Sequence, residues 1–352
     1  MIEKALEFFK NVLETPSPSG YEQPVQKIVR EYAADFSDKI DSDSHGNVIV
    51  VKNPQAPLRV MYAGHCDQIG LIVQYIDESG FIYVQPIGGW DPQQLIGQRL
   101  TVWSSSGPVQ GVIARKPIHL LTDEERKQVP KIKDLWIDIG ATCKEHAAEK
   151  VRVGDPVTFS LSFEMLSDDF ANSPGMDDKT GLWVVIEALR RAAAGNLACS
   201  LYSVSTVQEE IGLRGARTSA YGIDPHVGIA VDVTHATDCP TVDKKTEGDI
   251  KLGGGPVITR GPNCNPEVVK RLIEVAEEKG IDYQLAAIGR ATPTDANSLQ
   301  VTRSGVATAL VSVPNRYMHS AVETISLSDI DQTAELLAGF ALSLQGDENF
   351  NP

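Results

Sequence analysis

The chain has 352 residues, 42% of them hydrophobic and 22% charged, which is typical of a globular protein of about two domains with a sizeable core. No stretch approaches the roughly 20 apolar residues of a membrane span, so we expect no membrane partner. The formal net charge of −15, without a basic stripe carrying interleaved aromatic residues, also argues against nucleic-acid binding.

The N-terminal part of the chain, residues 1–65, is predicted to form helices and then strands. Acidic residues interrupt the apolar pattern of MIEKALEFFKNVLE, which predicts an amphipathic helix rather than a secretory signal. A second helix is predicted for VQKIVREYAADF, and strands for GNVIVVK and PLRVMYAGH. The five scattered cysteines contain no CxxC motif. Together with the missing signal pattern, they lead us to expect a cytoplasmic protein.

Residues 70 to about 165 have a different pattern, because short alternating runs replace the helices. Turn signals such as DESG, SSSG and RVGD separate these runs, and LTDEERKQVPKIKD is predicted to be an exposed loop. The pattern predicts a compact all-β module. Its predicted strands lie in GLIVQYI, GFIYVQPI, RLTVWS, VQGVIARK, LWIDIGA and PVTFSLSFEML.

From about residue 170, helices and buried strands alternate again, which predicts a mostly parallel mixed sheet flanked by helices. We therefore expect an α/β domain formed by residues 1–68 and 166–352, interrupted by a β-rich insertion at residues 69–165. The predicted strands are LYSVSTV, VGIAVDV and ATALVSVP, and the predicted helices are KTGLWVVIEALRRAAAG, PEVVKRLIEVAEEKG and LSDIDQTAELLAGFALSL.

Polar side chains that bind metals follow several of the predicted strands. Each residue alone has an ordinary explanation as a turn, cap or surface group, and the adjacent acids Asp177 and Asp178 suit a helix start. Ligands gather at the carboxyl ends of strands in open α/β sheets, however, so five segments that meet at one edge indicate a site. The candidates are His65, Asp67, Asp177, Glu209, Glu210, Asp232 and His319.

Two histidines and several carboxylates, without a thiolate, form a donor set suited to Zn²⁺, Co²⁺ or Mn²⁺. A pair of such ions polarises a carbonyl and activates water, and a carboxylate outside the metal ligands can act as the general base. Asp67 lies two residues after His65, on the same side of an extended chain. We therefore expect Asp67 to orient the imidazole of His65.

Glu209 and Glu210 stand side by side after a buried strand, in VSTVQEEIGLRGA. Two neighbouring carboxylates there are costly unless cations lie beside them. Adjacent residues of an extended chain face opposite ways. We therefore expect the two glutamates to have different roles, one binding a metal and the other transferring protons.

Six ordered segments resemble one family of dinuclear metallopeptidases, the glutamyl, deblocking and tetrahedral (TET) aminopeptidases. The resemblance covers nearly the whole chain. It implies an α/β aminopeptidase domain of three layers, a small β domain used for dimerisation, a two-metal site, and often an assembly of twelve subunits. The segments are YAGHCDQIGLIV, MDDKTG, VQEEIGLRGA, AVDVTHATD, TPTDANSLQVTRSGVAT and VPNRYMHSAVETI.

The resemblance also implies a role for each candidate residue. Asp177 matches the carboxylate that bridges two metals, and Glu209 the general base. Asp67 matches the carboxylate that orients His65. The remaining ligands match as two pairs, His65 with Asp232 on one metal and Glu210 with His319 on the other. The sequence departs from the family pattern at Cys66, Gln68 and Lys179.

The sequence thus predicts a cytoplasmic aminopeptidase that uses two divalent ions, most simply Zn²⁺, with Co²⁺ or Mn²⁺ as alternatives. Its expected partners are peptide substrates and further copies of the chain, in a homododecamer built from dimers. One alternative is a related two-metal amidohydrolase, such as a dipeptidase, carboxypeptidase or N-acyl deacetylase. Others are a glycoside hydrolase that uses the two glutamates and an assembly scaffold without activity.

Overall fold

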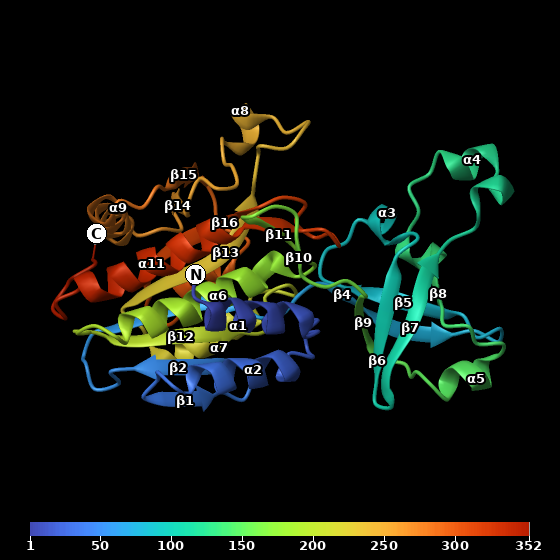
Figure 1. Ribbon diagram of the computed structural model, residues 1–352, viewed down its shortest axis with the longest axis horizontal. Helices are drawn as coiled ribbons and strands as arrows, with labels where there is room; N and C mark the ends of the chain where they lie inside the picture. Colours follow the sequence, from blue (N-terminus) through green and yellow to red (C-terminus); the bar gives the residue numbers. More distant parts are fainter. Residues whose placement is uncertain (352) are drawn as a thin grey trace.

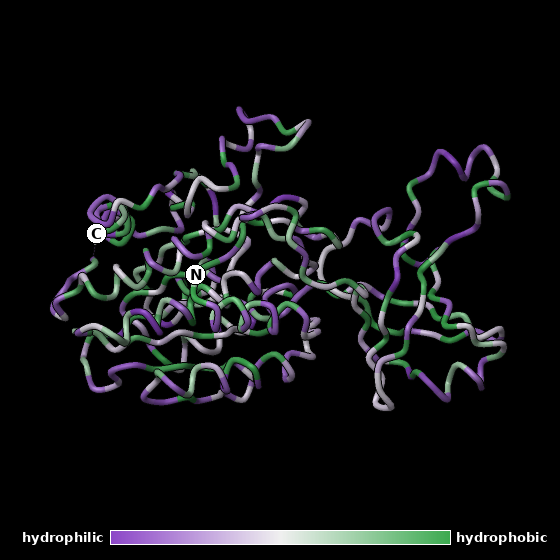
Figure 2. Tube along the Cα trace, in the orientation of Figure 1, coloured by the Kyte–Doolittle hydropathy of each residue, from purple (hydrophilic) through white to green (hydrophobic). Residues whose placement is uncertain are grey.

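The computed structural model describes residues 1–351, which form two lobes of unequal size (Figure 1). The larger lobe is a mixed β-sheet between helical layers, and the smaller lobe is a β-barrel. Hydrophobic residues follow the inner strands of both lobes, whereas the projecting segment around the short helix α8 (Lys244–Glu247) is mainly hydrophilic (Figure 2). This architecture confirms the predicted α/β fold with an all-β module inserted into it.

The large sheet has eight strands, and its centre is a block of four parallel strands, β12, β3, β13 and β16. The carboxyl ends of these four strands meet at one edge of the sheet. The remaining strands make the sheet mixed, because β2 and β14 run antiparallel to the block. In spatial order the strands are β1 (Lys39–Ser42), β2 (Val48–Lys52), β12 (Ser200–Thr206), β3 (Arg59–His65), β13 (Val227–His235), β16 (Ala307–Asn315), β14 (Val257–Arg260) and β15 (Gln284–Ala287).

Helices cover both faces of the large sheet. The central helix of one face, α6 (Met176–Ala192), packs on β3, β12 and β13. Its layer also contains α1 (Glu3–Glu14), α2 (Gln23–Ala33), α9 (Pro266–Lys279) and α11 (Leu327–Ser343). The other layer contains α7 (Arg214–Ile223) and α10 (Asp295–Gln300), and the short helix α8 (Lys244–Glu247) lies on a projecting segment.

Helix α6 lies unusually close to the central strand β3, because glycines face each other at the contact. A Cβ atom added to Gly64 would lie only 2.4 Å from the carbonyl carbon of Gly181. The missing side chains allow the first turn of α6 to approach the end of β3. This contact brings Asp177 to His65.

The smaller lobe is a closed antiparallel barrel with an apolar core of its own. The LTDEERK segment contains a short exposed helix, α4, where only a loop was predicted; a capping box between Thr122 and Glu125 stabilises it. The barrel strands are β4 (Gly70–Ile76), β5 (Ile82–Ile87), β6 (Arg99–Ser104), β7 (Gly107–Ala114), β8 (Trp136–Asp138) and β9 (Pro156–Phe159). The helices beside them are α3 (Pro92–Leu95), α4 (Asp123–Arg126) and α5 (Lys144–Ala148), with 3₁₀ turns at Ile118–Leu120 and Ile132–Asp134.

A small third sheet lies where the chain returns from the barrel to the large lobe. It pairs β10 (Glu164–Met165), β11 (Phe170–Asn172) and β17 (Thr324–Ser326). This sheet therefore joins the segment before α6 to the segment that follows β16. Across residues 1–351, no helix is both long enough and apolar enough to pass through a membrane.

Candidate metal centre

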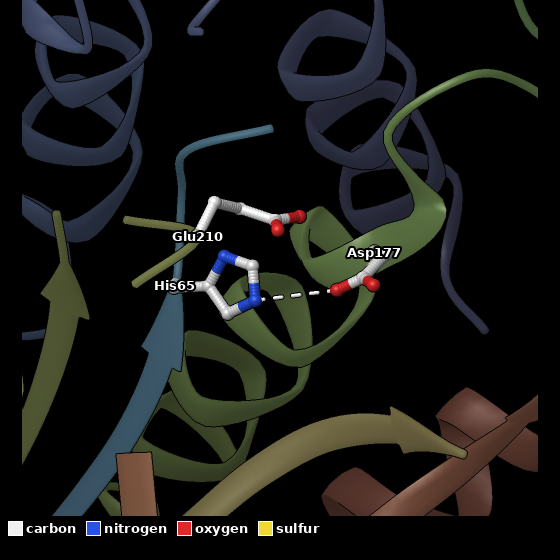
Figure 3. Close-up of side chains that lie close together, drawn as sticks. All are labelled: His65, Asp177 and Glu210. Carbon is white, nitrogen blue, oxygen red and sulfur yellow. Dashed lines mark ion pairs between the residues drawn. The ribbon is translucent and has the colours of Figure 1, made fainter. Parts of the chain in front are cut away.

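The carboxyl ends of the central parallel strands bring the predicted site residues together. One ligand atom each from His65, Asp177 and Glu210 lie within 4.8 Å of one another (Figure 3). His65 ends β3, Asp177 opens α6, and Glu210 lies in the turn after β12. The side chain of His319, from the loop after β16, reaches the same place: its Nε2 lies 3.4 Å from Glu210 Oε2.

Asp177 lies between the two histidines. Its Oδ1 is 3.2 Å from Nε2 of His65, the pair joined by the dashed line in Figure 3, and its Oδ2 is 3.3 Å from Nε2 of His319. Each carboxylate oxygen thus faces one imidazole. A carboxylate in this position can serve two metal ions at once.

Both histidines are held so that the same ring nitrogen remains available. Nδ1 of His65 lies 3.0 Å from the backbone carbonyl of Asp67, and Nδ1 of His319 lies 2.9 Å from that of Gly89. A carbonyl only accepts hydrogen bonds, so each Nδ1 must donate. In the neutral imidazole this leaves the lone pair on Nε2, which is the arrangement of a metal ligand.

The turn after β12 separates the two neighbouring glutamates. Strand β12 ends at Thr206, so both glutamates lie beyond it, in a turn where Gln208 has a positive φ of 56°. Oε2 of Glu209 is 3.8 Å from Nε2 of His65, whereas Glu210 lies beside His319. A backbone turn, rather than the alternation of a strand, therefore sets where each of the two side chains lies.

Asp67 fixes the backbone of this turn. Its Oδ1 accepts a hydrogen bond from the N–H of Glu209 at 3.0 Å, and its Oδ2 accepts one from the N–H of Glu210 at 3.2 Å. The hydroxyl of Ser19 donates to Oδ2 at 2.6 Å. The carboxylate is 3.5 Å from Nδ1 of His65, so the nearer partner of that imidazole is the backbone carbonyl of Asp67.

Asp232 and Asp178 complete the side of the cluster next to His65. Their ligand atoms lie within 4.8 Å of one another and of His65, and Asp232 Oδ1 is 4.0 Å from His65 Nε2. Asp178 accepts hydrogen bonds from two backbone N–H groups, those of His65 at 3.2 Å and Gly181 at 2.9 Å. Asp178 therefore ties α6 to β3, while Asp232 faces the imidazole.

The electrostatics of the cluster are those of a site that needs cations. Burial raises the pKa of both Glu209 and Glu210 well above the usual range. It also raises the pKa of Asp232 to about 8. Oε1 of Glu210 is buried and has no hydrogen-bond partner among the described residues. Divalent ions would reverse these shifts and give that oxygen a partner, so the donor set fits a metal centre.

Sequence reasoning missed Glu323, which is buried and contacts the backbone of two predicted site residues, Asp177 and His319. Its Oε2 accepts a hydrogen bond from the N–H of Asp177 at 3.0 Å, and its Oε1 accepts one from the N–H of His319 at 2.8 Å. Glu323 lies four residues after His319, in the segment HSAVE. No spacing rule assigns it a role, because both partners are backbone N–H groups and one of them, that of Asp177, lies in a distant segment of the chain.

Two of the departures from the family pattern contact each other. The ammonium of Lys179, which is fully buried, donates to Gln68 Oε1 at 2.6 Å and to the carbonyl of Thr15 at 2.7 Å. Burial lowers the pKa of Lys179 to about 7. The third departure, Cys66, is buried, and its carbonyl accepts a hydrogen bond from Ser17. None of the three replaces a residue of the cluster.

Comparison with known proteins identifies the family. The family model of the M42 glutamyl aminopeptidases matches residues 46–336. The chain belongs to the M42 glutamyl aminopeptidase family. It is therefore a metal-dependent peptide hydrolase of the aminopeptidase type, which confirms the predicted resemblance and reaction class.

Several relatives match nearly the whole chain. The lysyl aminopeptidase of Pyrococcus furiosus is 41% identical and covers 94% of each chain. A TET aminopeptidase from a marine sediment thaumarchaeon is 34% identical, covers 97% of each chain and has a TM-score of 0.93. A Pyrococcus horikoshii peptidase, described as assembling into a tetrahedron or a large octahedral shell, is 32% identical. It has a TM-score of 0.86 over 97% of this chain and 100% of its own.

One structural neighbour carries a different description. A protein of Thermotoga maritima described as an endoglucanase is 26% identical, with a TM-score of 0.78 over 95% of this chain and 96% of its own. A glycosidase needs two carboxyl groups on either side of a sugar. Here each glutamate has a histidine as its neighbour instead, which is an arrangement for metals.

Proposed function

We propose that this aminopeptidase binds two divalent ions, Zn²⁺ or its substitutes Co²⁺ or Mn²⁺, in the cluster around Asp177. Asp177 would be shared by the two ions. His65 and Asp232 would complete one position, and Glu210 and His319 the other. The observation that carries this proposal is the place of Asp177, with one oxygen toward each Nε2 atom.

Bound ions would polarise the scissile carbonyl and make a water molecule easier to deprotonate. Glu209 would act as the general base that accepts a proton from water and returns it to the leaving amine, because its buried carboxylate is part of the cluster but outside both proposed ligand pairs. Asp67 is a positioning residue, since its carboxylate holds the backbone of both glutamates.

We further propose a division of the chain into a catalytic domain, residues 1–68 and 166–352, and a dimerisation domain, residues 69–165. The assembly would be a homododecamer built from dimers; related TET structures are described as a dodecamer and as a tetrahedron or large octahedral shell. Exposed apolar side chains of the barrel, Ile118, Leu120 and Val129, support a contact surface there. A cytoplasmic location is supported by the five cysteines, all of which are free in residues 1–351.

The proposed function can be tested by refilling the metal-depleted protein with each ion in turn. The refilled samples are assayed on a panel of aminoacyl-anilides that includes lysyl, glutamyl and leucyl substrates. We expect release of the first residue with at least one ion and none after chelation. No hydrolysis of any substrate with any ion would contradict the proposal.

Three further substrates separate the alternatives. A peptide with a blocked amino terminus but a free carboxyl terminus reports a carboxypeptidase, and an N-acetyl amino acid reports a deacetylase. A soluble cellulose derivative reports a glycosidase, which should not depend on added metal. Light scattering of the same samples gives the assembly, expected at about twelve times the mass of one chain.

A further inference from the structure

The loop that joins β5 to α3 in the barrel touches the metal cluster of the other lobe. The carbonyl of Gly89 accepts the hydrogen bond from Nδ1 of His319 at 2.9 Å. The barrel thus supplies the group that fixes which nitrogen of His319 faces the metals. The equivalent contact of His65 comes from Asp67, in the large lobe.

The neighbouring residue, Gly88, leaves no room for a side chain at this junction. A Cβ atom on Gly88 would lie 3.3 Å from Oε2 of Glu210 and 2.5 Å from Cγ2 of Ile69. That oxygen of Glu210 is the one beside His319. Gly88 also has a positive φ of 76°, which favours glycine. A larger residue would therefore clash with Ile69 and also press on the carboxylate of a proposed ligand.

The barrel holds this loop from its own side. Nε1 of Trp90 donates to the carbonyl of Gly70 at 2.8 Å, and the Trp90 ring packs edge-on against Phe159, with centroids 5.2 Å apart. Ala321, two residues after His319, is buried within the apolar core of the barrel. The loop and the His319 segment are thus both anchored to the smaller lobe.

We propose that the loop Gly88–Trp90 is a positioning element for one metal position, that of Glu210 and His319, and not for the other. The active site is then shared by the two lobes, and the inserted barrel supports catalysis directly as well as any role in assembly. This inference rests on the proposed two-metal assignment. It predicts that a change in the barrel loop weakens the binding of one ion and spares the second.

The test is calorimetric titration of the metal-depleted protein with Co²⁺. Wild type is expected to bind two ions per chain. In Gly88→Ala one ion keeps its affinity, and the other binds about 10- to 100-fold more weakly, the usual effect of losing support behind a ligand. The matched control is Gly97→Ala: Gly97 is also in the barrel and has a positive φ of 84°, but no described atom lies within 4 Å of its added Cβ. It should bind both ions as wild type does.

A double-mutant cycle identifies which ion is affected. His319→Ala removes a ligand of the barrel-side position, so adding Gly88→Ala to it should change the remaining affinity no further. In Asp232→Asn, which weakens the other position, Gly88→Ala should remove the remaining tight binding. If Gly88→Ala does not fold, Trp90→Phe replaces it, because it releases the anchor without adding bulk.

The results that overturn the inference are equally specific. Wild-type binding of both ions by Gly88→Ala, or by Trp90→Phe where that variant replaces it, would show that the loop does not position His319. Equal weakening of both ions would show that its effect is not selective. Failure of the wild-type protein itself to bind two ions would instead contradict the two-metal assignment, and this outcome is distinguishable because it appears before any substitution.

Discussion

At the scale of single residues, Glu209 has the simplest assignment to test. Glu209→Gln keeps the size of the side chain and removes its ability to accept a proton. We expect kcat on an aminoacyl-anilide to fall about 10²- to 10⁴-fold, the usual contribution of a general base. Metal content, measured by elemental analysis, should stay unchanged. A rate close to that of wild type would contradict the role of Glu209.

Glu210→Gln is the matched comparison, because it makes the same change one residue later. Glu210 lies beside His319 and has an unpartnered buried oxygen. We expect this variant to lose metal as well as activity. If both variants keep their metal, Glu210 is not a ligand.

Asp67 gives a second prediction at this scale, because one carboxylate accepts three hydrogen bonds. In Asp67→Asn an amide N–H₂ replaces one of the accepting oxygens, and at least one buried donor loses its partner. We expect a loss of about 1–3 kcal/mol in the free energy of unfolding, measured by urea denaturation, and a lower kcat. Ser19→Ala removes only a donor to the same carboxylate, so its effect should be smaller.

The sequence predicted which residues gather at the site, but not how they are held. His65 ends a buried strand, Asp232 lies within one and Glu209 follows one, and the apolar runs around them are visible in the chain. The contacts of Glu323 and Gly89 are different. Glu323 accepts a hydrogen bond from the backbone of Asp177, more than a hundred residues away, and Gly89 accepts one from His319, which lies in the other lobe. No local pattern encodes such contacts.

At the scale of elements, the contact between α6 and β3 decides where Asp177 lies. Gly64→Ala would place a methyl group 2.4 Å from backbone atoms of Gly181, which cannot turn aside as a side chain would. Overpacking of this kind costs about 1–3 kcal/mol. We expect a lower free energy of unfolding and weaker metal binding, measured by urea denaturation and elemental analysis.

Gly222→Ala is the control for this prediction. Gly222 lies in α7, and no described atom is within 4 Å of the position its Cβ would take. Alanine also favours a helix over glycine by up to about 1 kcal/mol, so this variant should be as stable as wild type or more stable. If Gly64→Ala and Gly222→Ala lower the free energy of unfolding by similar amounts, the effect at Gly64 does not come from the close approach of α6.

The long elements of the fold were predictable because burial repeats along them. Strands β3, β12, β13 and β16 are buried over nearly their whole length, and α9 alternates buried and exposed positions at helical spacing. Edge strands such as β1 and β15 are short and half exposed, so their residues carry little pattern. The glutamate pair was expected at a strand end, but the turn conformation at Gln208 is set by tertiary contacts.

At the scale of the whole molecule, the cluster makes stability depend on both metal and pH. Burial raises the pKa of Asp232 and of Glu323 to about 8 in the metal-free protein. Such groups have a pKa of about 4 in an unfolded chain. Between these values the folded state holds protons that the unfolded state has released. The metal-free protein therefore loses stability as the pH rises from about 4 through 8.

Metal binding should act in the opposite direction, because bound cations require the ionised carboxylates. We expect the difference in melting temperature between metal-loaded and chelator-treated protein to be larger at pH 8.5 than at pH 6. Scanning calorimetry at the two pH values measures it, and Asp232→Asn should reduce the difference. A difference in melting temperature at pH 8.5 that is equal to or smaller than the difference at pH 6 would contradict this account of the cluster.

The position of the barrel in the chain has a consequence for synthesis on the ribosome. All six barrel strands have been made by residue 159, and they pair only with one another. Strand β3 is made earlier, but its partners β12 and β13 emerge only after residue 200. The strands of the smaller lobe can therefore pair while β3 still lacks its neighbours, and of the buried residues in the barrel core only Ala321 comes later in the chain.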